Sequence, residues 1–466
     1  MANANLNIPV LSGGILNTNF FNGRILAAED LITFQVANAQ QHRQLGRAIG
    51  DGVAWGLDIT LSDTSTIVQP ILHITQGLAL NRKGEAVALP VDVDLALVKS
   101  ADVVSANAGL FAECAPPQGL IPTNLDCYLL TVSPTSGYQG LTPATYPSDS
   151  GFASKCASRN TIEGVKFSML PLGVSNPSAS DPTTLPGQAA QLYAQLKPLF
   201  VQLVGLTGAA ASALQAQIAP LLSKFRNVVA HLCFGTDTIA TFPANPFPPA
   251  NSDSPFAEYG ALDLLRTQGI LTDCAVPLAL VYWTAAGVQF VDMWSVRRPL
   301  LSTPASESWP VFASNRRLAE GLAMFLQFQK QTEDLHSDLP RSQLASAVAT
   351  DYFRFLPGAG LLPIGDVKSS TGFDYLQFFA SRTFRNPVFA EGAVLDSLFC
   401  RSLLYPPIDF TNQEMFWLYW VRENIETINT NIAEAPQQYL IFSNGHLPFQ
   451  GETRFDLNYW DYANYV

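Results

Sequence analysis

The sequence is poor in charged residues. Only 14% of its 466 residues are Asp, Glu, Lys or Arg, whereas about 25% is typical of soluble domains. A free monomer covers its surface with charged side chains, but the cores of protein–protein interfaces are depleted of them. The shortage therefore favours a subunit that hides much of its surface against neighbours. The alternative is a large monomer whose surface is rich in Ser, Thr, Asn and Gln.

Basic residues are scarce and scattered. The chain has 26 Lys and Arg against 38 Asp and Glu, which gives a formal net charge of −12. The longest basic runs are pairs, at Arg297-Arg298 and Arg316-Arg317. Nucleic acids and anionic membrane surfaces both require a basic footprint on their partners. Neither is an expected partner of this chain.

A targeting segment and a clear membrane span are both missing from the sequence. The N-terminal residues lack the basic region and apolar run of a secretory signal, which predicts synthesis in the cytoplasm and release, if any, as part of a particle. Residues 198–223 carry no charge, but Pro198, Gly205, Gly208 and Pro220 interrupt them. A buried or interfacial helix is expected there, with a membrane-inserting segment as the alternative.

The cysteines lack the spacing of a metal site. The six of them are Cys114, Cys127, Cys156, Cys233, Cys274 and Cys400. No two are separated as in C-x-x-C, so a zinc site is not expected. Buried free thiols are the default prediction for a chain without a secretory signal. A bridge among the first three, which share one loop-rich region, stays open.

Catalytic motifs are missing too. The sequence contains no G-x-S-x-G and no H-E-x-x-H, and no local element holds two of the five histidines. Residues 360–369 resemble a phosphate loop only faintly, because Asp366 stands where the loop requires lysine. Asp92 and Asp94 share one face of a predicted strand, where exposed aspartates on a β edge are a simpler explanation than acid–base work or calcium binding. We therefore expect no catalytic, metal or cofactor-binding residue, and a protein that is not an enzyme.

Hydrophobic periodicity predicts an α+β fold with an N-terminal helix and a small antiparallel β module. The helix is expected over residues 27–49, because Gly50 and Gly52 stop it. Period-two alternation between Val53 and Leu97 predicts short antiparallel strands after it. The next region, residues 110–185, is expected to be rich in loops, with strands near 127–132 and 165–170.

The second half is expected to be mainly helical with an inserted β-hairpin. A long helical region is predicted over 189–229 and the hairpin over 277–294. Ser314 can cap a further helix through about Leu335. Thr411 and Glu414 have the spacing of a capping box, which predicts a helix through about Ile428.

These elements suggest five regions. They are an N-terminal arm (1–26), a helix plus small β module (27–105), a loop-rich β region and linker (106–187), a helical region with the hairpin (188–300) and a mainly helical C-terminal region (301–466).

Two segments near the N-terminus are candidate interfaces. The arm carries Leu6, Ile8 and Val10 ahead of Phe20-Phe21, and it can add a strand to a neighbouring subunit or fold back on its own domain. In the helix that follows, Asn38 and Gln41 lie seven residues after Leu31 and Phe34, so they continue the same face. Polar residues on an apolar seam can fix register and partner number in helix bundles; a surface helix with a short apolar stripe is the alternative.

Aromatic residues crowd the C-terminal part of the chain. Phe416, Trp417, Tyr419 and Trp420 fall on the helix expected after Thr411. Such rings commonly pack cores or protein interfaces. Beside Asp and Asn they can also stack on sugars, so a soluble carbohydrate- or surface-binding protein, with glycans as partner, is the alternative function.

Two groups of short motifs carry a family resemblance. The first comprises Asn19-Phe20-Phe21-Asn22-Gly23-Arg24, Ala28-Glu29-Asp30-Leu31, Gly50-x-Gly52-Val53-x-x-Gly56-Leu57 and Gly77-Leu78-Ala79-Leu80 with Gly84. The second comprises Pro277-Leu278-Ala279, Phe290-Val291-Asp292-Met293-Trp294 and Leu356-Pro357 through Gly360-Leu361-Leu362-Pro363. They resemble segments of uncharacterised bacterial proteins from gene clusters for contractile, phage-tail-like injection systems.

The resemblance implies a non-enzymatic component of a multi-subunit particle, such as a baseplate, collar, cage or fibre-adaptor protein. It carries over no catalytic residue and does not choose among these positions. Its implied partners are other protein subunits.

Overall fold

The fold is known from a computed structural model. The described residues are 11, 14–67, 69–97, 126–148, 151–174, 181–236, 260–300, 315–363, 373–380, 388–389, 392–412, 415–422 and 438–444. Leu6, Ile8, Val10, Cys114 and the aromatic tail after residue 444 lie outside them.

The N-terminal part is one helix on a small β module, as predicted. Helix α1 (Ala28–Ile49) begins where the Asp30 carboxylate accepts a hydrogen bond from the Ala27 backbone N–H at 3.1 Å, and acidic side chains are favourable at this end of a helix. The module has two antiparallel three-stranded sheets. Their strands are β1 (Gly52–Gly56), β4 (Gly77–Leu80) and β5 (Ala86–Leu89) in one, and β2 (Ile59–Leu61), β3 (Ile71–Ile74) and β6 (Val93–Ala96) in the other.

A long β-ribbon replaces most of the loop-rich region that the sequence predicted. Strands β7 (Cys127–Ser148) and β8 (Gly151–Pro171) pair along their whole length, so the short strands expected at 127–132 and 165–170 are only the base of the ribbon. The expectation of loops was wrong for these residues because Ser, Thr, Gly and Pro dominate the outer ribbon, and those residue types also mark turns. Cross-strand pairing decides the conformation here.

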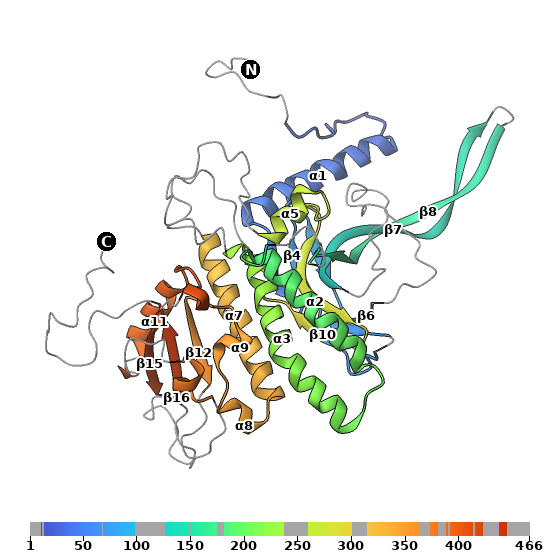
Figure 1. Cartoon of the computed structure of the whole chain (residues 1–466). Coiled ribbons are helices and arrows are strands. Elements are labelled where there is room, and N and C mark those ends of the chain that lie inside the picture. Colours follow the sequence, from blue (N-terminus) through green and yellow to red (C-terminus); the bar gives the residue numbers. More distant parts are fainter. Residues whose placement is uncertain are drawn as a thin grey trace, which may run out of the picture.

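The predicted hairpin is present and holds the base of the ribbon. Strands β9 (Val276–Thr284) and β10 (Gly287–Asp292) continue the sheet in the order β10-β9-β7-β8. On the side of β7, strand β9 pairs with Cys127–Val132 and no further along the strand. Beyond Val132, β7 and β8 pair only with each other; Ser136 is still buried, and from Tyr138 outward the two strands form an exposed ribbon that leaves the body of the molecule, as Figure 1 shows.

Helices α2 (Leu185–Leu203) and α3 (Gly208–Phe234) pack on one face of the β10-β9-β7-β8 sheet. The helical region expected over 189–229 is a hairpin of these two helices, broken at 204–207. Helix α5 (Ala261–Thr267) follows, and then the long α7 (Asn315–Asp338), which fulfils the prediction of a helix through Leu335. The short helices α8 (Arg341–Leu344) and α9 (Ala349–Tyr352) come next, and the Ser223 hydroxyl of α3 donates to the Tyr352 carbonyl of α9 at 3.2 Å.

The C-terminal part contains a sheet where the sequence predicted helix. Strands β12 (Ala359–Pro363), β16 (Gln438–Ser443), β15 (Trp417–Arg422) and β13 (Val388–Phe389) form it in this order. Around it lie the small β11–β14 pair (Phe355–Leu356, Ile408–Asp409), α10 (Tyr375–Phe378), α11 (Gly392–Ser402) and the 3-10 turn Phe410–Asn412. The α+β fold class is confirmed, while the five-region division stays a prediction.

The helix expected over 411–428 was wrong for the part that the structure describes, residues 411–412 and 415–422; the remainder lies outside the described residues. The Asp409 carboxylate accepts hydrogen bonds from the N–H and hydroxyl groups of Thr411, at 2.7 and 2.8 Å, and these contacts build the 3-10 turn in place of a capped helix. Residues 417–422 then pair with β16. Aromatic and β-branched residues in this run favour a strand once a partner strand is available.

Separate apolar cores support these parts. One fills the β module around Leu57 and Leu72. A second surrounds Tyr282 on β9, whose ring lies 4.9 Å from Phe225 of α3 and 5.9 Å from Phe200 of α2, between centroids. Burial raises the pKa of Tyr282 above its ordinary value. The third core, between α7 and the C-terminal sheet, is built from Phe328, Phe353, Phe378, Phe379, Phe416 and Phe442.

A buried histidine makes the stability of the fold depend on pH. His231 of α3 stacks on Phe355 with ring centroids 4.7 Å apart and shares a hydrogen bond of 2.7 Å with Thr236. Burial first, and the charge of Arg354 second, lower its pKa to about 3. The unfolded chain therefore binds a proton at this site between pH 6.5 and 3 that the folded chain does not bind. The contribution of His231 to stability is complete above about pH 6.5 and falls as the pH drops.

We predict that the free energy of unfolding of the wild-type chain falls more steeply with acidification than that of His231→Gln, which keeps a polar partner for Thr236 but does not titrate. The difference should approach about 1.4 kcal/mol for each pH unit below 6. Urea unfolding of both proteins at several pH values between 7 and 4 measures it. Parallel pH profiles would show that His231 is not buried in its neutral form.

Candidate interaction surfaces

Helix α1 is held to the body along one narrow line. A side chain on Gly46 would overlap the backbone carbonyl of Gly84 in the β4–β5 turn, so the two glycines allow the helix to touch the turn directly. Arg43 forms an ion pair of 2.7 Å with Glu85, and the Arg47 side chain donates to the Lys83 carbonyl at 3.2 Å. These contacts define the docked face of α1.

The opposite face of α1 is apolar and exposed. Leu31, Phe34, Leu45 and Ile49 are 51%, 39%, 64% and 56% exposed. At 3.6 residues per turn, Leu31, Phe34 and Leu45 fall on one stripe with Ile49 at its edge, about half a turn from Arg43 and Arg47. A surface helix ordinarily shows its charged side to water and its apolar side to the core, and α1 has the reverse arrangement.

The predicted interface residues Asn38 and Gln41 lie on this same stripe. Asn38 is half-buried and Gln41 is exposed. They stand between the Leu31–Phe34 pair and Leu45, so the seam predicted from the sequence exists as a surface of the folded chain. Their role at an interface stays a prediction.

The segment before α1 contacts the start of the helix. The Thr18 hydroxyl donates to the Asp30 carbonyl at 2.7 Å, and Arg24 forms an ion pair with the Asp30 side chain. The ring of Phe20 meets Phe34 edge-on, with centroids 5.7 Å apart. Phe20 and Phe21 are still 49% and 62% exposed, so both predicted anchor residues lie on the surface beside the stripe.

The β7–β8 ribbon is a second exposed surface. It carries Tyr138, Leu141 and Ile162 as exposed large side chains. An isolated two-stranded ribbon is marginally stable in water at best, and free strand edges invite pairing with other chains. The ribbon therefore has the features of an arm that another protein supports.

The tip of the α2–α3 hairpin is a third exposed apolar surface. Val201, Val204 and Leu206 gather there within the uncharged stretch 198–223. None of the helices in the described residues combines the length and the apolar character that a membrane span requires. The stretch predicted as a buried or interfacial helix forms the end of α2, the connection 204–207 and the first part of α3 up to Ser223.

The Gly50–Leu57 motif packs against the segment that follows strand β10. The Arg297 guanidinium donates to the carbonyls of Gly56 and Leu57, at 2.6 and 3.3 Å, and pairs with Asp58 at 2.9 Å. A side chain on Gly52, which has a φ of +135°, would collide with the backbone of Pro299. The motif glycines of the β module and the segment after β10 are therefore required for close backbone packing.

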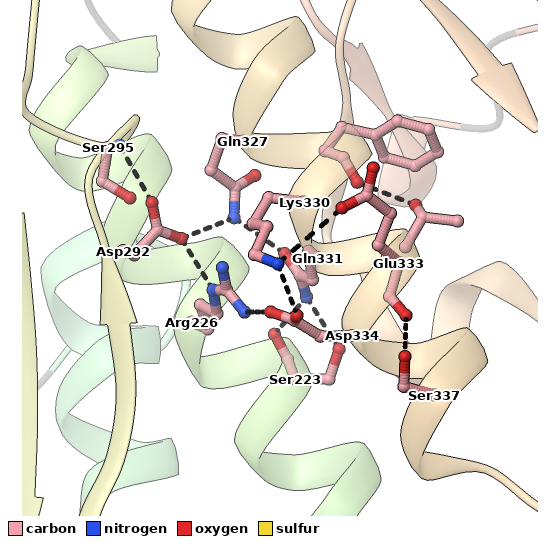
Figure 2. A network of polar contacts seen from close by, with 12 residues as sticks. Ser223, Arg226, Asp292, Ser295, Gln327, Lys330, Gln331, Glu333, Asp334 and Ser337 are labelled. Atoms are coloured by element: carbon pink, nitrogen blue, oxygen red, sulfur yellow. Dashed lines mark hydrogen bonds and ion pairs between the residues drawn. The ribbon is translucent and has the colours of Figure 1, made fainter. Parts of the chain in front are cut away.

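A buried polar network joins the two halves of the molecule (Figure 2). Arg226 of α3 donates to Asp292 of β10 at 2.7 Å and to Asp334 of α7 at 2.6 Å. Gln327 donates to Asp292 at 3.2 Å and to Gln331 at 2.8 Å. Burial alone would lower the pKa of Arg226, but the two carboxylates outweigh it and raise the pKa.

This network acts as a structural joint. Its two carboxylates share the buried Arg226 guanidinium; Asp292 also accepts from the Gln327 amide, and Asp334 also pairs with Lys330 at 3.2 Å. The network links α3, β10 and α7. In the described part of the chain, no group of three or more His, Cys, Asp or Glu side chains is arranged to hold a metal ion.

The remaining polar candidates are dispersed. Asp94 lies 2.8 Å from Nδ1 of His73, and Asp92 lies 3.9 Å from Nε2, on the exposed face of the β2-β3-β6 sheet. Asp92 also accepts the backbone N–H of Gln76 at 2.7 Å. The two aspartates that the sequence placed on one face thus flank one histidine, a pairing across strands that no local pattern could predict.

The cysteines are mostly free thiols. Cys127 and Cys233 are buried and free, and burial raises the pKa of both thiols, that of Cys233 to about 12. Cys156 and Cys400 are exposed and free. A bridge between Cys127 and Cys156 is therefore absent, while Cys274 is disulfide-bonded, contrary to the default expectation of free thiols.

The aromatic residues singled out for sugar binding serve the C-terminal core. Phe416 and Tyr419 are fully buried on and beside β15. Trp420 packs edge-on against Tyr375, with centroids 5.5 Å apart. These rings do not form an exposed stacking platform.

Comparison with known proteins gives distant structural likenesses. No protein-family model matches the chain, and no curated protein matches its sequence. The chain is distantly similar to a crystal structure of TssK, with 12% identity over 55% of this chain and 70% of that one and a TM-score of 0.20. It is similarly related to a chain of the type VI secretion system TssK-TssF-TssG baseplate subcomplex, with 12% identity over 54% of this chain and 98% of that one and a TM-score of 0.18.

We predict that the two carboxylates at the joint differ in their effect on stability. Asp292→Asn leaves Arg226 buried beside a neutral amide and should lower the free energy of unfolding by about 3 kcal/mol. Asp334→Asn removes a half-exposed partner and should cost less than about 1 kcal/mol. Chemical denaturation of both variants provides the comparison, and equal losses would argue against a joint centred on Asp292.

Proposed function

We propose that this chain is a non-enzymatic structural subunit of a contractile, phage-tail-like injection particle, in a baseplate, collar, cage or fibre-adaptor position. The observation that carries the proposal is the inverted polarity of α1, with its charged residues on the docked side and an apolar stripe in water. A free monomer gains nothing from this arrangement, whereas a subunit can cover the stripe with a neighbour.

The ribbon supports the same function by an independent route. Its outer part, from Tyr138 to Ser148 on β7, pairs only with β8 among the described residues. At about 3.3 Å per residue, this stretch spans roughly 35 Å. An arm of this length can reach across a neighbouring subunit, and contact there would stabilise pairing that is marginal in water.

The choice of particle rests on the sequence motifs. Asn19 to Arg24 and Gly50 to Leu57 carry the resemblance to proteins of contractile injection clusters. The likeness to TssK adds no weight, because TM-scores of 0.20 and 0.18 do not establish a shared fold. Sheath, tube and baseplate genes beside the gene for this chain would support the particle type.

We predict that the native chain sediments with a megadalton particle. A mass-resolved sedimentation profile of a native lysate tests this directly, with the purified chain run alone as the control. Recovery of the chain only in low-mass fractions would contradict the proposal. Binding of the purified monomer to a glycan array would instead favour the carbohydrate-binding alternative.

We predict that the outer ribbon is dispensable for folding and required for assembly. Ser136 and Glu163 are register partners, so an Asn-Gly turn can replace residues 137–162 and close the shortened hairpin. The variant should keep the melting temperature of the wild type within about 2 °C and lose most of its incorporation into the particle. Thermal unfolding and lysate sedimentation measure the two effects.

A charge variant keeps the ribbon intact and tests its surface. Leu141→Asp with Ile162→Asp should reduce incorporation, whereas Asn160→Asp, on a polar site of the same strand, should not. Full incorporation of the shortened chain would show that the ribbon is not a contact arm.

We predict that the arm acts between subunits. Deleting residues 2–18 should leave the melting temperature of the isolated chain unchanged and reduce its incorporation, because Leu6, Ile8 and Val10 would then no longer reach a neighbour. Thermal unfolding again provides the control. A fall of many degrees in the melting temperature would mean that the arm belongs to its own core.

A further inference from the structure

We propose that α1 pairs with α1 of a second copy of this chain, through the stripe formed by Leu31, Phe34, Asn38, Gln41, Leu45 and Ala48. This inference rests on the proposed function, because it identifies one of the neighbours that an assembly subunit must have. It follows from the spacing, the chemistry and the position of the stripe on the molecule.

The spacing of the stripe is that of a coiled-coil seam. Its positions alternate by three and four residues along the helix, which places them at the a and d positions of a heptad. The helix of 22 residues is about 33 Å long. In Figure 1 it lies at the outer edge of the molecule, with the segment before it running back alongside it, where Phe20 packs on Phe34.

The chemistry of the stripe suits an identical partner. It contains no charged side chain. Gln35, His42 and Ile49 border it on one edge, and Asp30, Ala37 and Gln44 border it on the other, where the Asp30 carboxylate is already paired with Arg24. Two copies can therefore approach without like charges facing each other, whereas a partner chosen by charge would have nothing to recognise. The helix's Glu29, Arg43 and Arg47 are on the docked side.

The amides of Asn38 and Gln41 strengthen the case for self-pairing. An amide side chain carries both a donor and an acceptor, so each can bond the matching amide of a second copy. In a parallel pair Asn38 faces Asn38, and in an antiparallel pair Asn38 faces Gln41. In either arrangement the amides of Asn38 and Gln41, which form a polar layer within the seam, are buried and hydrogen-bonded to each other.

The polar layer also determines register. A polar residue at a single a position fixes the alignment and the number of helices, at a cost in stability. Asn38 and Gln41 stand at the middle of the seam, with Leu31 and Phe34 on one side and Leu45 on the other. A shift by one heptad would place amides against leucine or phenylalanine and leave them without partners.

The segment before the helix extends the contact. Phe20 packs on Phe34 and is 49% exposed, so its ring widens the N-terminal end of the stripe. A single helix pair with this extension falls near the lower end of the roughly 1,200–2,000 Å² of specific interfaces. We therefore expect a dissociation constant in the micromolar range.

Sedimentation of the purified full chain over a range of concentrations tests the proposal. The wild type should associate at tens of micromolar. Leu45→Glu should raise the dissociation constant at least tenfold, while Ile32→Glu should change it less than twofold. Ile32 is the matched control, because it is 57% exposed on the same helix but lies off the stripe. Far-UV circular dichroism confirms that both variants fold.

Two further variants probe the polar layer. Asn38→Leu should associate more tightly but as a mixture of oligomers, since the residue that sets helix number is lost. The double variant Asn38→Cys with Gln41→Cys, made in a chain with Cys156→Ser and Cys400→Ser, should form a disulfide-linked dimer on oxidation. The single variants then report whether the helices run parallel or antiparallel.

The outcomes separate this inference from the proposed function. If the purified wild type stays monomeric at 100 µM and the double-cysteine variant does not cross-link, α1 does not pair with itself. Equal behaviour of Leu45→Glu and Ile32→Glu would overturn it as well. If the chain nevertheless sediments with a megadalton particle, the subunit function stands and the stripe faces a different protein; if it does not, both proposals fail.

Discussion

The fold depends on one buried guanidinium. Arg226 joins α3 to β10 and α7, and both of its carboxylate partners come from segments more than 60 residues away in the chain. Moving such charges out of water is costly, and the ion pairs offset that cost only in good geometry with the remaining hydrogen bonds supplied. Gln327 contributes one of them to Asp292, and the backbone N–H of Ser295 donates another at 3.1 Å. These contacts fix the positions of α3, strand β10 and α7 relative to one another.

Around this joint the interior is closely packed, whereas the two projecting parts, α1 and the outer β7–β8 ribbon, have few contacts with the body. Glycines let backbones touch at Gly52 and Gly56, and aromatic rings fill the two large cores. By contrast, α1 is held along one line, and the outer ribbon has no third strand. Rigid body and loosely held extensions together suit a subunit that recognises its neighbours through projecting parts, as proposed above.

The polarity of α1 also gives a physical meaning to the low charge of the chain. With 14% charged residues, the protein could have spread its few charges evenly over its surface. Instead, Arg43 and Arg47 of α1 contact the β4–β5 turn, and the outward stripe of the helix consists of amide and apolar side chains. The composition and this one helix therefore point independently to a covered surface.

Local patterns in the sequence determined the N-terminal helix, the strands of the β module, the β9–β10 hairpin and α7, because each has a clear periodicity and its own stop signals. They also placed Asn38 and Gln41 on the face of Leu31 and Phe34, since helix geometry alone decides that. The sequence did not predict the ribbon or the strand at Trp417–Arg422, whose residues suit turns or helices until a partner strand pairs with them. Nor could it bring Arg226 to Asp292, or His73 to Asp94. Those contacts join residues far apart along the chain, and only the packed tertiary structure decides which buried charge or strand finds which partner.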